Sequence, residues 1–199
     1  MKIEIAGRFN HPIGRVYEVM YKRFEQFPSR IPNVLEIREM ERKVLVEGTH
    51  EQTVHRWTAD SKLIPGFARP FIKPETLQWL GIADWKHGER VVYFDFRSHV
   101  FRNLYECKGE FRLREEGAVT ALDINAHLDI YADRLPGVPN WFAKRAVGVI
   151  EKLLMNAIEP SLAALPDAVE YYLQHPDESL ADPGSIDAPD RYPIRSGLN

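Results

Sequence analysis

The stretch RVVYFDFRSHVFRNLYECKGEFRLREEGAVTALDINAHLDIYA, which runs from Arg90 to Ala132, decides the fold. Three segments of strand length follow one another in it, at residues 90–100, 103–115 and 118–132. Only Phe101-Arg102 and Glu116-Gly117 separate them, and no helical segment lies between. Consecutive strands at hairpin spacing pair antiparallel, so this stretch predicts a meander of neighbouring strands.

Four more segments upstream have the same character and cover residues 1–9, 34–46, 50–60 and 76–85. Glu47-Gly48-Thr49 is a hairpin turn between two of them. In the strand at 50–60, Thr53, His55 and Trp57 are expected on one face, with Val54 and Arg56 on the other. The sequence therefore predicts an α+β fold with a curved antiparallel sheet of six or seven strands.

Helices are predicted at two places. Asn10-His11-Pro12 starts the first, which covers Ile13–Phe27 and ends at Pro28. Asn140–Glu159 is apolar around much of its circumference, which is typical of a helix packed against a large surface. Pro160 is expected to kink or end this long helix, and Pro166 to begin a short extension through Leu173. One long helix in a large concave sheet tends to leave a pocket between them.

The composition indicates where the folded domain ends and which classes of partner are excluded. Residues 176–199 are rich in Pro, Asp, Ser and Gly, which predicts a disordered acidic tail after a domain at 1–175. The whole chain carries 26 Lys and Arg against 29 Asp and Glu, a net charge of −3, and the acidic excess falls in that tail. This balance argues against a nucleic-acid partner. A single cysteine, Cys107, fits a reducing compartment, and no apolar run reaches the roughly 18 residues of a membrane span. We expect a cytoplasmic protein, either free or peripheral to a membrane.

One apolar stretch between Asp60 and Thr76 is too long for an ordinary turn. Its apolar residues stand beside cations and are Leu63, Ile64, Phe67, Phe71 and Ile72, next to Lys62, Arg69 and Lys73. Such a segment can cover a cavity or touch an anionic membrane surface transiently, here through Leu63–Ile72. The alternative is a loop that packs its aromatic side chains onto the core.

Three short motifs carry a resemblance to a known family. They are Tyr21–Phe24 with Pro28-Ser29 and Val34-Leu35; Arg56-Trp57-Thr58 through Ile64-Pro65; and Phe94–His99 followed by Glu106. Together with the order of elements, they resemble the START-like helix-grip (SRPBCC) superfamily and, within it, the PRELI-type phospholipid-transfer proteins. The resemblance implies a sheet wrapped around a long C-terminal helix, with a lipid or other hydrophobic small molecule bound in, or transferred through, the internal cavity. It also implies that Arg23 contacts a phosphate headgroup, and that Lys144 or Lys152 corresponds to the lysines of the family's C-terminal helix.

The candidate ligand-binding residues include these cations, residues of the apolar loop and inward-facing groups of the strands. They are Arg23, Arg56, Leu63, Phe67, Phe71, Trp79, His99, Glu106, Lys144 and Lys152. His99 and Glu106 are interpreted either as a polar pair inside the cavity or as a structural hydrogen-bonded pair.

Nothing in the sequence supports catalysis directly. The row Asp123, Asn125, His127 and Asp129 shares one strand face, where it forms an acid–base site or, as we expect, a solvated outer surface. No metal-binding motif, cofactor fingerprint or nucleophile motif is present, and Cys107 has no base nearby in the sequence. We therefore predict no metal, cofactor or catalytic residue. A cyclase- or hydratase-like enzyme and a regulatory interaction domain stay open as alternatives to lipid binding.

Overall fold

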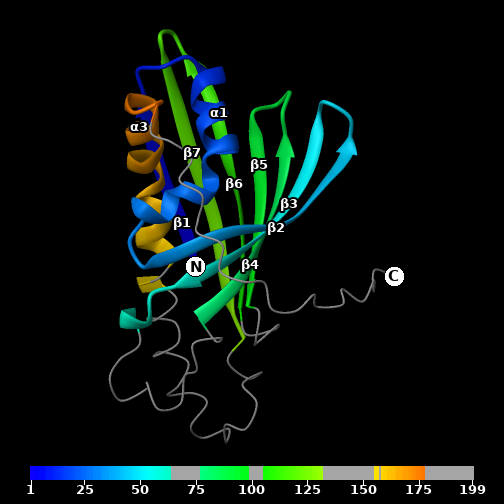
Figure 1. Ribbon diagram of the computed structural model, residues 1–199, viewed down its shortest axis with the longest axis vertical. Helices are drawn as coiled ribbons and strands as arrows, with labels where there is room; N and C mark the ends of the chain where they lie inside the picture. Colours follow the sequence, from blue (N-terminus) through cyan, green and yellow to red (C-terminus); the bar gives the residue numbers. More distant parts are fainter. Residues whose placement is uncertain (64–76, 99–104, 132–154, 157, 178–199) are drawn as a thin grey trace, which may run out of the picture.

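The computed structural model describes residues 1–63, 77–98, 105–131, 155–156 and 158–177. Seven strands form one antiparallel sheet: β1 (Lys2–Phe9), β2 (Val34–Val46), β3 (His50–Ala59), β4 (Gln78–Lys86), β5 (Val91–Ser98), β6 (Tyr105–Glu116) and β7 (Val119–Ile130). The helical elements are α1 (Ile13–Lys22), η1 (Phe24–Ser29), η2 (Ser61–Leu63) and α3 (Leu165–Gln174). Figure 1 shows α1 and α3 on one side of a strongly curved sheet. The predicted α+β fold with a curved antiparallel sheet is confirmed.

The strand order is β1-β7-β6-β5-β4-β3-β2, so every strand from β2 to β7 lies beside its neighbour in sequence. This is the predicted meander, and the observed strand ends differ from the predicted ones by only a few residues. β1 is the exception, since it crosses to the far edge and pairs with β7 from Lys2 opposite His127 to Phe9 opposite Thr120. The N-terminal amine of Met1 also donates a hydrogen bond to the Leu128 carbonyl at 2.5 Å.

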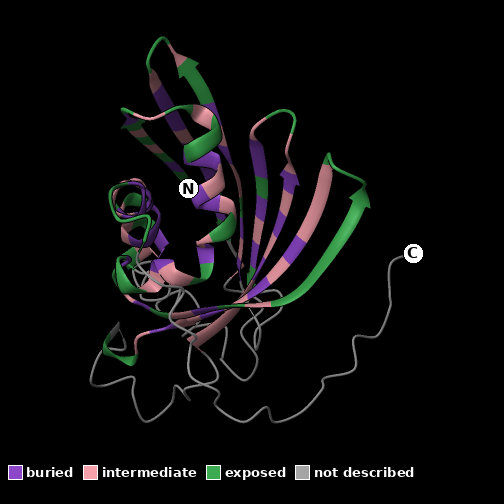
Figure 2. Ribbon diagram, turned by 45° about the horizontal axis from the view of Figure 1, so that its top comes forward, coloured by how far each residue is buried: buried purple, intermediate pink, exposed green. Residues whose placement is uncertain are grey.

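The two faces of the sheet follow the alternation in the sequence. In β3, Thr53, His55 and Trp57 are buried on the concave face, as predicted. In β7, Leu122, Ile124, Ala126 and Leu128 are buried in the same way. Figure 2 shows the resulting stripes of buried and exposed residues along the strands.

The polar row of β7 lies on the outer face. His127 bonds to Asp129 at 3.0 Å, and Arg114 of β6 pairs with Asp123 at 2.7 Å. The row is therefore the solvated surface that we expected rather than an acid–base site inside the fold.

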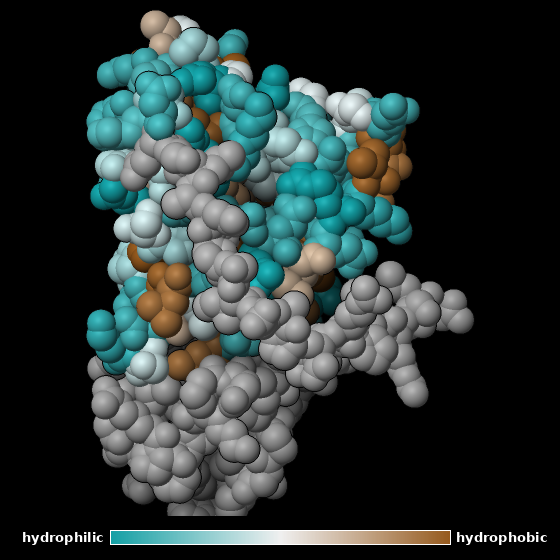
Figure 3. All heavy atoms as spheres, viewed as in Figure 1, coloured by the Kyte–Doolittle hydropathy of each residue, from teal (hydrophilic) through white to brown (hydrophobic). Residues whose placement is uncertain are grey.

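The two edge strands differ in character. β1 exposes Lys2 and Glu4, which form an ion pair at 2.6 Å. β2 instead exposes apolar side chains near its hairpin with β3, where Val44, Leu45 and Val46 are 55%, 40% and 55% exposed. Figure 3 shows this apolar patch at the tip of the β2–β3 hairpin. An apolar edge strand is an arrangement that favours contact with another chain.

The first helix is shorter than predicted. α1 ends at Lys22, because Arg23 leaves the helical region with φ −111° and ψ 14°. The chain continues as the 3₁₀ helix η1, which contains Pro28 rather than stopping before it. The predicted single helix over Ile13–Phe27 is therefore wrong from Arg23 onward, and the break at Arg23 turns Phe24 and Phe27 into the core.

The C-terminal helix is described only in part. The predicted helix at 140–159 lies mostly outside the described residues. Residues 158–163 are helical, so the chain does not end its helix at Pro160. Pro166 stands in the first turn of α3, where the sequence predicts a new segment to begin. α3 buries Leu165, Ala168, Val169, Tyr172 and Leu173, and Tyr172 stacks on Phe27 of η1 at 5.9 Å.

Candidate functional site

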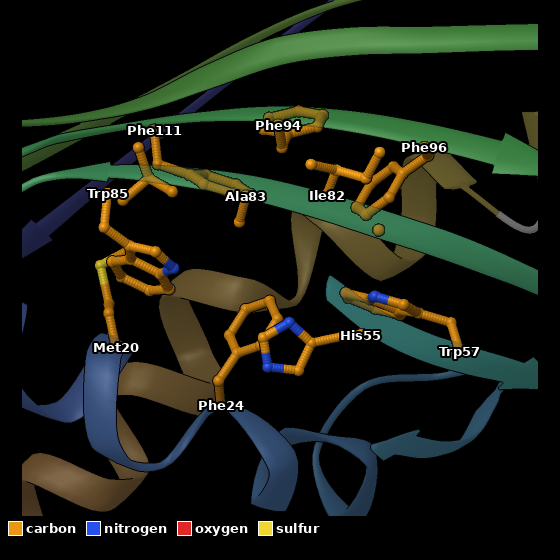
Figure 4. A pocket seen from close by; sticks show the side chains of 12 residues that line it. Met20, Phe24, His55, Trp57, Ile82, Ala83, Trp85, Phe94, Phe96 and Phe111 are labelled. Carbon is orange, nitrogen blue, oxygen red and sulfur yellow. The ribbon is translucent and has the colours of Figure 1, made fainter. Parts of the chain in front are cut away.

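A pocket lies between the concave face of the sheet and the junction of α1 and η1. Its lining comes from six elements and consists of Met20, Phe24, His55, Trp57, Gly81, Ile82, Ala83, Trp85, Val92, Phe94, Phe96 and Phe111 (Figure 4). The free volume among these side chains is about 10 Å³. This is room for about one water molecule, so a larger ligand has to displace part of the lining.

Aromatic rings make up the walls. Phe24 lies at the centre of the helical side and meets His55, Trp57 and Trp85 edge to face, with ring centroids 5.1, 5.6 and 6.3 Å apart. On the sheet side, Phe94 stacks on Phe111 at 4.6 Å. Such a lining favours planar, apolar molecules.

Glycine on the concave face makes room for these rings. A Cβ on Gly81 would lie 2.7 Å from Trp57 Nε1 and 2.9 Å from a ring carbon of Phe96. Real side chains do not approach so closely. Gly81 therefore leaves the space that the Trp57 indole and the Phe96 ring occupy.

Two polar atoms of the pocket lack partners among the described residues. They are Nδ1 of His55 and Nε1 of Trp57, and both side chains are only 3% exposed. The third polar ring behaves differently, because Trp85 Nε1 donates to Thr53 Oγ1 at 2.9 Å. Most buried polar groups in proteins are hydrogen-bonded, so the two unpaired atoms mark this place in the core as unusual.

The imidazole of His55 is neutral at physiological pH. Burial lowers its pKa from 6.5 to about 4, although the carboxylate of Glu39 raises it in part. Glu39 Oε2 lies 3.7 Å from Nε2, on the side of the ring away from the pocket. The site thus offers a neutral ring rather than a charge.

A network of polar groups lies beside the pocket and ties α1 to the sheet. Arg42 of β2 bonds to Glu39 at 2.6 Å and to Glu51 of β3 at 2.8 Å, and Glu51 also accepts a bond of 2.6 Å from Tyr21. The bond from Tyr21 and the Arg42 guanidinium lower the pKa of Glu51. These contacts hold the Tyr21 end of α1 against the sheet beside the pocket.

The predicted site residues do not gather in one place. Trp79 lies next to the pocket, since it stacks on Trp57 at 5.7 Å. Arg56 and Glu106 lie on the outer face, where Arg56 pairs with Glu36 at 3.5 Å and Glu106 with Lys108 at 2.9 Å. The alternation of β3 and β6 places these two charged side chains on the opposite side of the sheet from the pocket.

Most of the remaining predicted residues fall outside the described part of the chain. Leu63 ends the short helix η2, whereas Phe67, Phe71, His99, Lys144 and Lys152 lie outside the described residues. The apolar loop therefore stays a prediction. A structural hydrogen bond between His99 and Glu106 also stays a prediction, whereas the exposed Glu106 side chain does not lie inside the pocket.

Arg23 caps α1 and contacts the end of the domain. Its guanidinium donates to Gln26 Oε1 at 3.2 Å and to the carbonyl of Pro176, and it lies 5.5 Å from the centre of the Tyr172 ring. The contact with Pro176 extends one residue beyond the domain boundary predicted at 175. A headgroup contact through Arg23 would compete with these bonds.

Replacing Arg23 by alanine is expected to lower the free energy of unfolding by about 1 kcal/mol, because its bonds to Gln26 and Pro176 are lost. Urea unfolding measures this loss. Arg15→Ala on the same helix is the control, since within the described part of the chain the Arg15 side chain makes just one exposed pair, with Glu18 at 3.9 Å, and its loss should change stability by less than about 0.5 kcal/mol. Equal stability of both variants would show that Arg23 does not hold the C-terminal segment.

The sequence contained a signal for the pocket that the prediction did not use. His55 stands between Thr53 and Trp57 on a face that the alternation makes apolar and buried, and an inward histidine in such a row is a candidate for ligand contact. The prediction named Arg56, one residue away, instead.

Other chemistries find no support within the described ranges. No group of three His, Cys, Asp or Glu side chains there could hold a metal ion. Cys107 is fully buried, and burial raises its pKa to about 12, so its thiol stays protonated and is a poor nucleophile. No helix in this part of the chain is long and apolar enough to cross a bilayer.

No protein-family model and no curated protein matches the sequence. Solved structures do match its fold. Zhui aromatase/cyclase from a Streptomyces species gives a TM-score of 0.60 at 15% identity, covering 88% of this chain and 94% of that protein. A Thermus thermophilus protein gives 0.57 at 16% identity over 89% and 99% of the two chains. Norcoclaurine synthase from Thalictrum flavum gives 0.52 at 12% identity over 87% and 86%. At these identities the likeness concerns the fold alone, and it is a helix-grip fold, as the order of elements predicts.

Proposed function

We propose that this chain binds a hydrophobic small molecule in the pocket between α1–η1 and the concave face of the sheet. The observation that carries the proposal is the lining, which is formed by aromatic and aliphatic side chains from two helical elements and four strands and contains no charged group among the described residues. Sites for small molecules are mostly apolar and concave, with a few polar groups.

Binding requires a change in the lining, because the free volume is far below that of a ring system. The strands are fixed by their ladders, whereas the opposite wall consists of Met20 and Phe24 at the junction of α1 and η1. Methionine adapts its shape easily, and the junction at Arg23 is already non-helical. The helical wall is therefore the part that moves when a ligand enters.

Filling the pocket tests this proposal. Ala83 is 7% exposed and lines the sheet side, and Ala83→Met adds more atoms than the free volume holds. We expect wild-type protein to bind methylnaphthalene, a wholly apolar probe, and Ala83→Met to bind it at least tenfold more weakly, as measured by calorimetric titration. Overpacking costs about 1–3 kcal/mol, so thermal unfolding must show that the variant is folded.

Ala118→Met is the matched control, because Ala118 is exposed in the β6–β7 turn. It should bind the probe like wild type. Equal affinity of Ala83→Met and wild type would mean that the molecule binds elsewhere or not at all, and the proposal would fall. Mass spectrometry of organic extracts from the purified protein would then identify any natural ligand.

Lipid binding and transfer between membranes is the more specific form of this proposal, and the resemblance to PRELI-type proteins implies it. Its support is the apolar stretch Leu63–Ile72 beside cations in the sequence. Replacing Phe67 and Phe71 together by serine is expected to slow lipid transfer between vesicles while the unfolding temperature stays within a few degrees. If the double variant unfolds instead, these side chains belong to the core and the segment is not a membrane contact.

An enzyme acting on a hydrophobic substrate is the second candidate, and one observation favours it. The buried imidazole of His55 lines the pocket and is unprotonated at neutral pH, so it could accept a proton from a bound hydroxyl. A chemical change in an extracted ligand after incubation with fresh protein would favour the enzyme, and an unchanged ligand would favour binding or transfer.

A further inference from the structure

We propose that His55 and Trp57 form a recognition site for a neutral, ring-bearing ligand with a hydroxyl group, which accepts a hydrogen bond from Trp57 Nε1 and donates one to His55 Nδ1. This inference rests on the proposed function, because it names the chemistry of the molecule that the pocket takes.

Position and burial bring the two groups to the same ligand. His55 and Trp57 are two residues apart on β3, so their side chains leave the same face of the strand roughly 7 Å apart. Figure 4 shows the imidazole and the indole side by side along β3, both among the residues that surround the pocket. Within the described part of the chain, neither His55 Nδ1 nor Trp57 Nε1 has a hydrogen-bond partner.

The contacts of His55 determine that its ring accepts a hydrogen bond on the pocket side. Nε2 faces the carboxylate of Glu39 at 3.7 Å, and a negative charge on that side favours the tautomer with the proton on Nε2. Nδ1 then carries the lone pair and can only accept. Burial keeps the ring neutral by lowering its pKa to about 4.

Trp57 provides the hydrogen-bond donor that complements this acceptor. An indole N–H can only donate. Nε1 is buried without a partner among the described residues, and Gly81 lies against it with no side chain in the way, since a Cβ there would come within 2.7 Å. The pocket thus presents one donor and one acceptor in an apolar wall.

A hydroxyl group matches this pair, because it donates one hydrogen bond and accepts another. An ionised ligand does not match, because no charged side chain lines the pocket among the described residues and a buried unpaired charge is costly. The aromatic walls supply the surface for a ring. A neutral phenol-like or sterol-like alcohol is therefore the class of ligand that the site fits, rather than an acidic phospholipid.

The test compares two probes that differ in one group, naphthol and methylnaphthalene, titrated into the full chain by calorimetry. The measured quantity is the hydroxyl preference, which is the Kd of methylnaphthalene divided by the Kd of naphthol. We expect this preference to fall about tenfold in Trp57→Phe and in His55→Leu, because each variant leaves the hydroxyl without one partner. Trp57→Phe keeps an aromatic ring, so it preserves the fold if His55→Leu does not.

Trp85→Phe is the matched control. Trp85 lines the same pocket, but its N–H is already bonded to Thr53. This variant is expected to weaken both probes by the same factor and to leave the hydroxyl preference unchanged.

Three results would count against the inference in distinguishable ways. The same preference in wild type, Trp57→Phe and His55→Leu would overturn the recognition site while binding itself stands. An equal loss of preference in Trp85→Phe would assign the effect to packing and overturn the site as well. Failure of the wild type to bind either probe would overturn the proposed function and this inference together.

Discussion

Gly109→Ala is expected to destabilise the protein by about 3 kcal/mol or more. Gly109 stands on the concave face of β6, between Phe94 of β5 and Ala126 of β7. A Cβ there would collide with the backbone carbonyl of Asn125 and would lie 2.6 Å from the Phe94 ring. The ring could turn away, but the carbonyl belongs to the β6–β7 ladder and cannot.

Thermal unfolding measures this effect as a fall of roughly 6–12 °C in Tm, since 1 kcal/mol corresponds to about 2–4 °C for a domain of this size. Gly88→Ala is the control, because no atom lies within 4 Å of a Cβ at this turn position. It should change stability by less than about 0.5 kcal/mol. Similar Tm values for the two variants would show that β6 and β7 are farther apart at Gly109 than described.

The second large effect is a pH dependence of stability that His55 controls. Its pKa is about 4 in the folded protein, against 6.5 in a solvated histidine. Between these two pKa values, His55 is protonated in the unfolded chain but not in the folded chain, so a lower pH favours unfolding. The free energy of unfolding should therefore fall by about 3 kcal/mol from this residue alone as pH drops from 6.5 to 4.

Urea unfolding of wild type and His55→Leu at a series of pH values checks this. The readout is the difference between the two proteins in the free energy of unfolding, because carboxylates also titrate near the lower end of this pH range and affect both proteins alike. Burial is the main cause of the shift, whereas Glu39 opposes it and Arg42 adds to it. The His55→Leu curve should lie above wild type increasingly toward low pH. Trp57→Phe removes a neighbouring polar group that does not ionise. This variant should therefore keep the wild-type dependence of the free energy of unfolding on pH. Parallel curves for wild type and His55→Leu would mean that His55 is protonated in the folded core.

Much of the fold follows from local pattern in the sequence. The alternation around His55 and along β7 predicts which side chains are buried, because a strand exposes successive residues to opposite faces. The pairing of β1 with β7 was not predictable in this way, since nothing near Lys2 specifies a partner more than a hundred residues away. The break at Arg23 was also missed, because it depends on Phe24 and Phe27 turning into the core and not on a helix-breaking residue.

The site was harder to predict than the fold. The family resemblance led the prediction to Arg56 and Glu106, yet both side chains lie on the outer face. His55 and Trp57 matter instead because tertiary packing leaves their polar atoms without partners, and hydrogen-bond partners are set by residues distant in sequence. Gly81 is a similar case, since the positions of the Trp57 and Phe96 rings explain why a glycine stands there.

The pairing of β1 with β7 has a consequence for synthesis on the ribosome. β1 is made first, but its partner residues from Thr120 to His127 are made last among the strands. At about 5–20 residues per second, the nascent chain carries an unpaired β1 for roughly 6–24 s before the sheet can close. During that interval its unpaired backbone groups stay available to other chains and to chaperones. The charged side chains of Lys2, Glu4 and Arg8 keep the unpaired β1 hydrated until β7 leaves the ribosome.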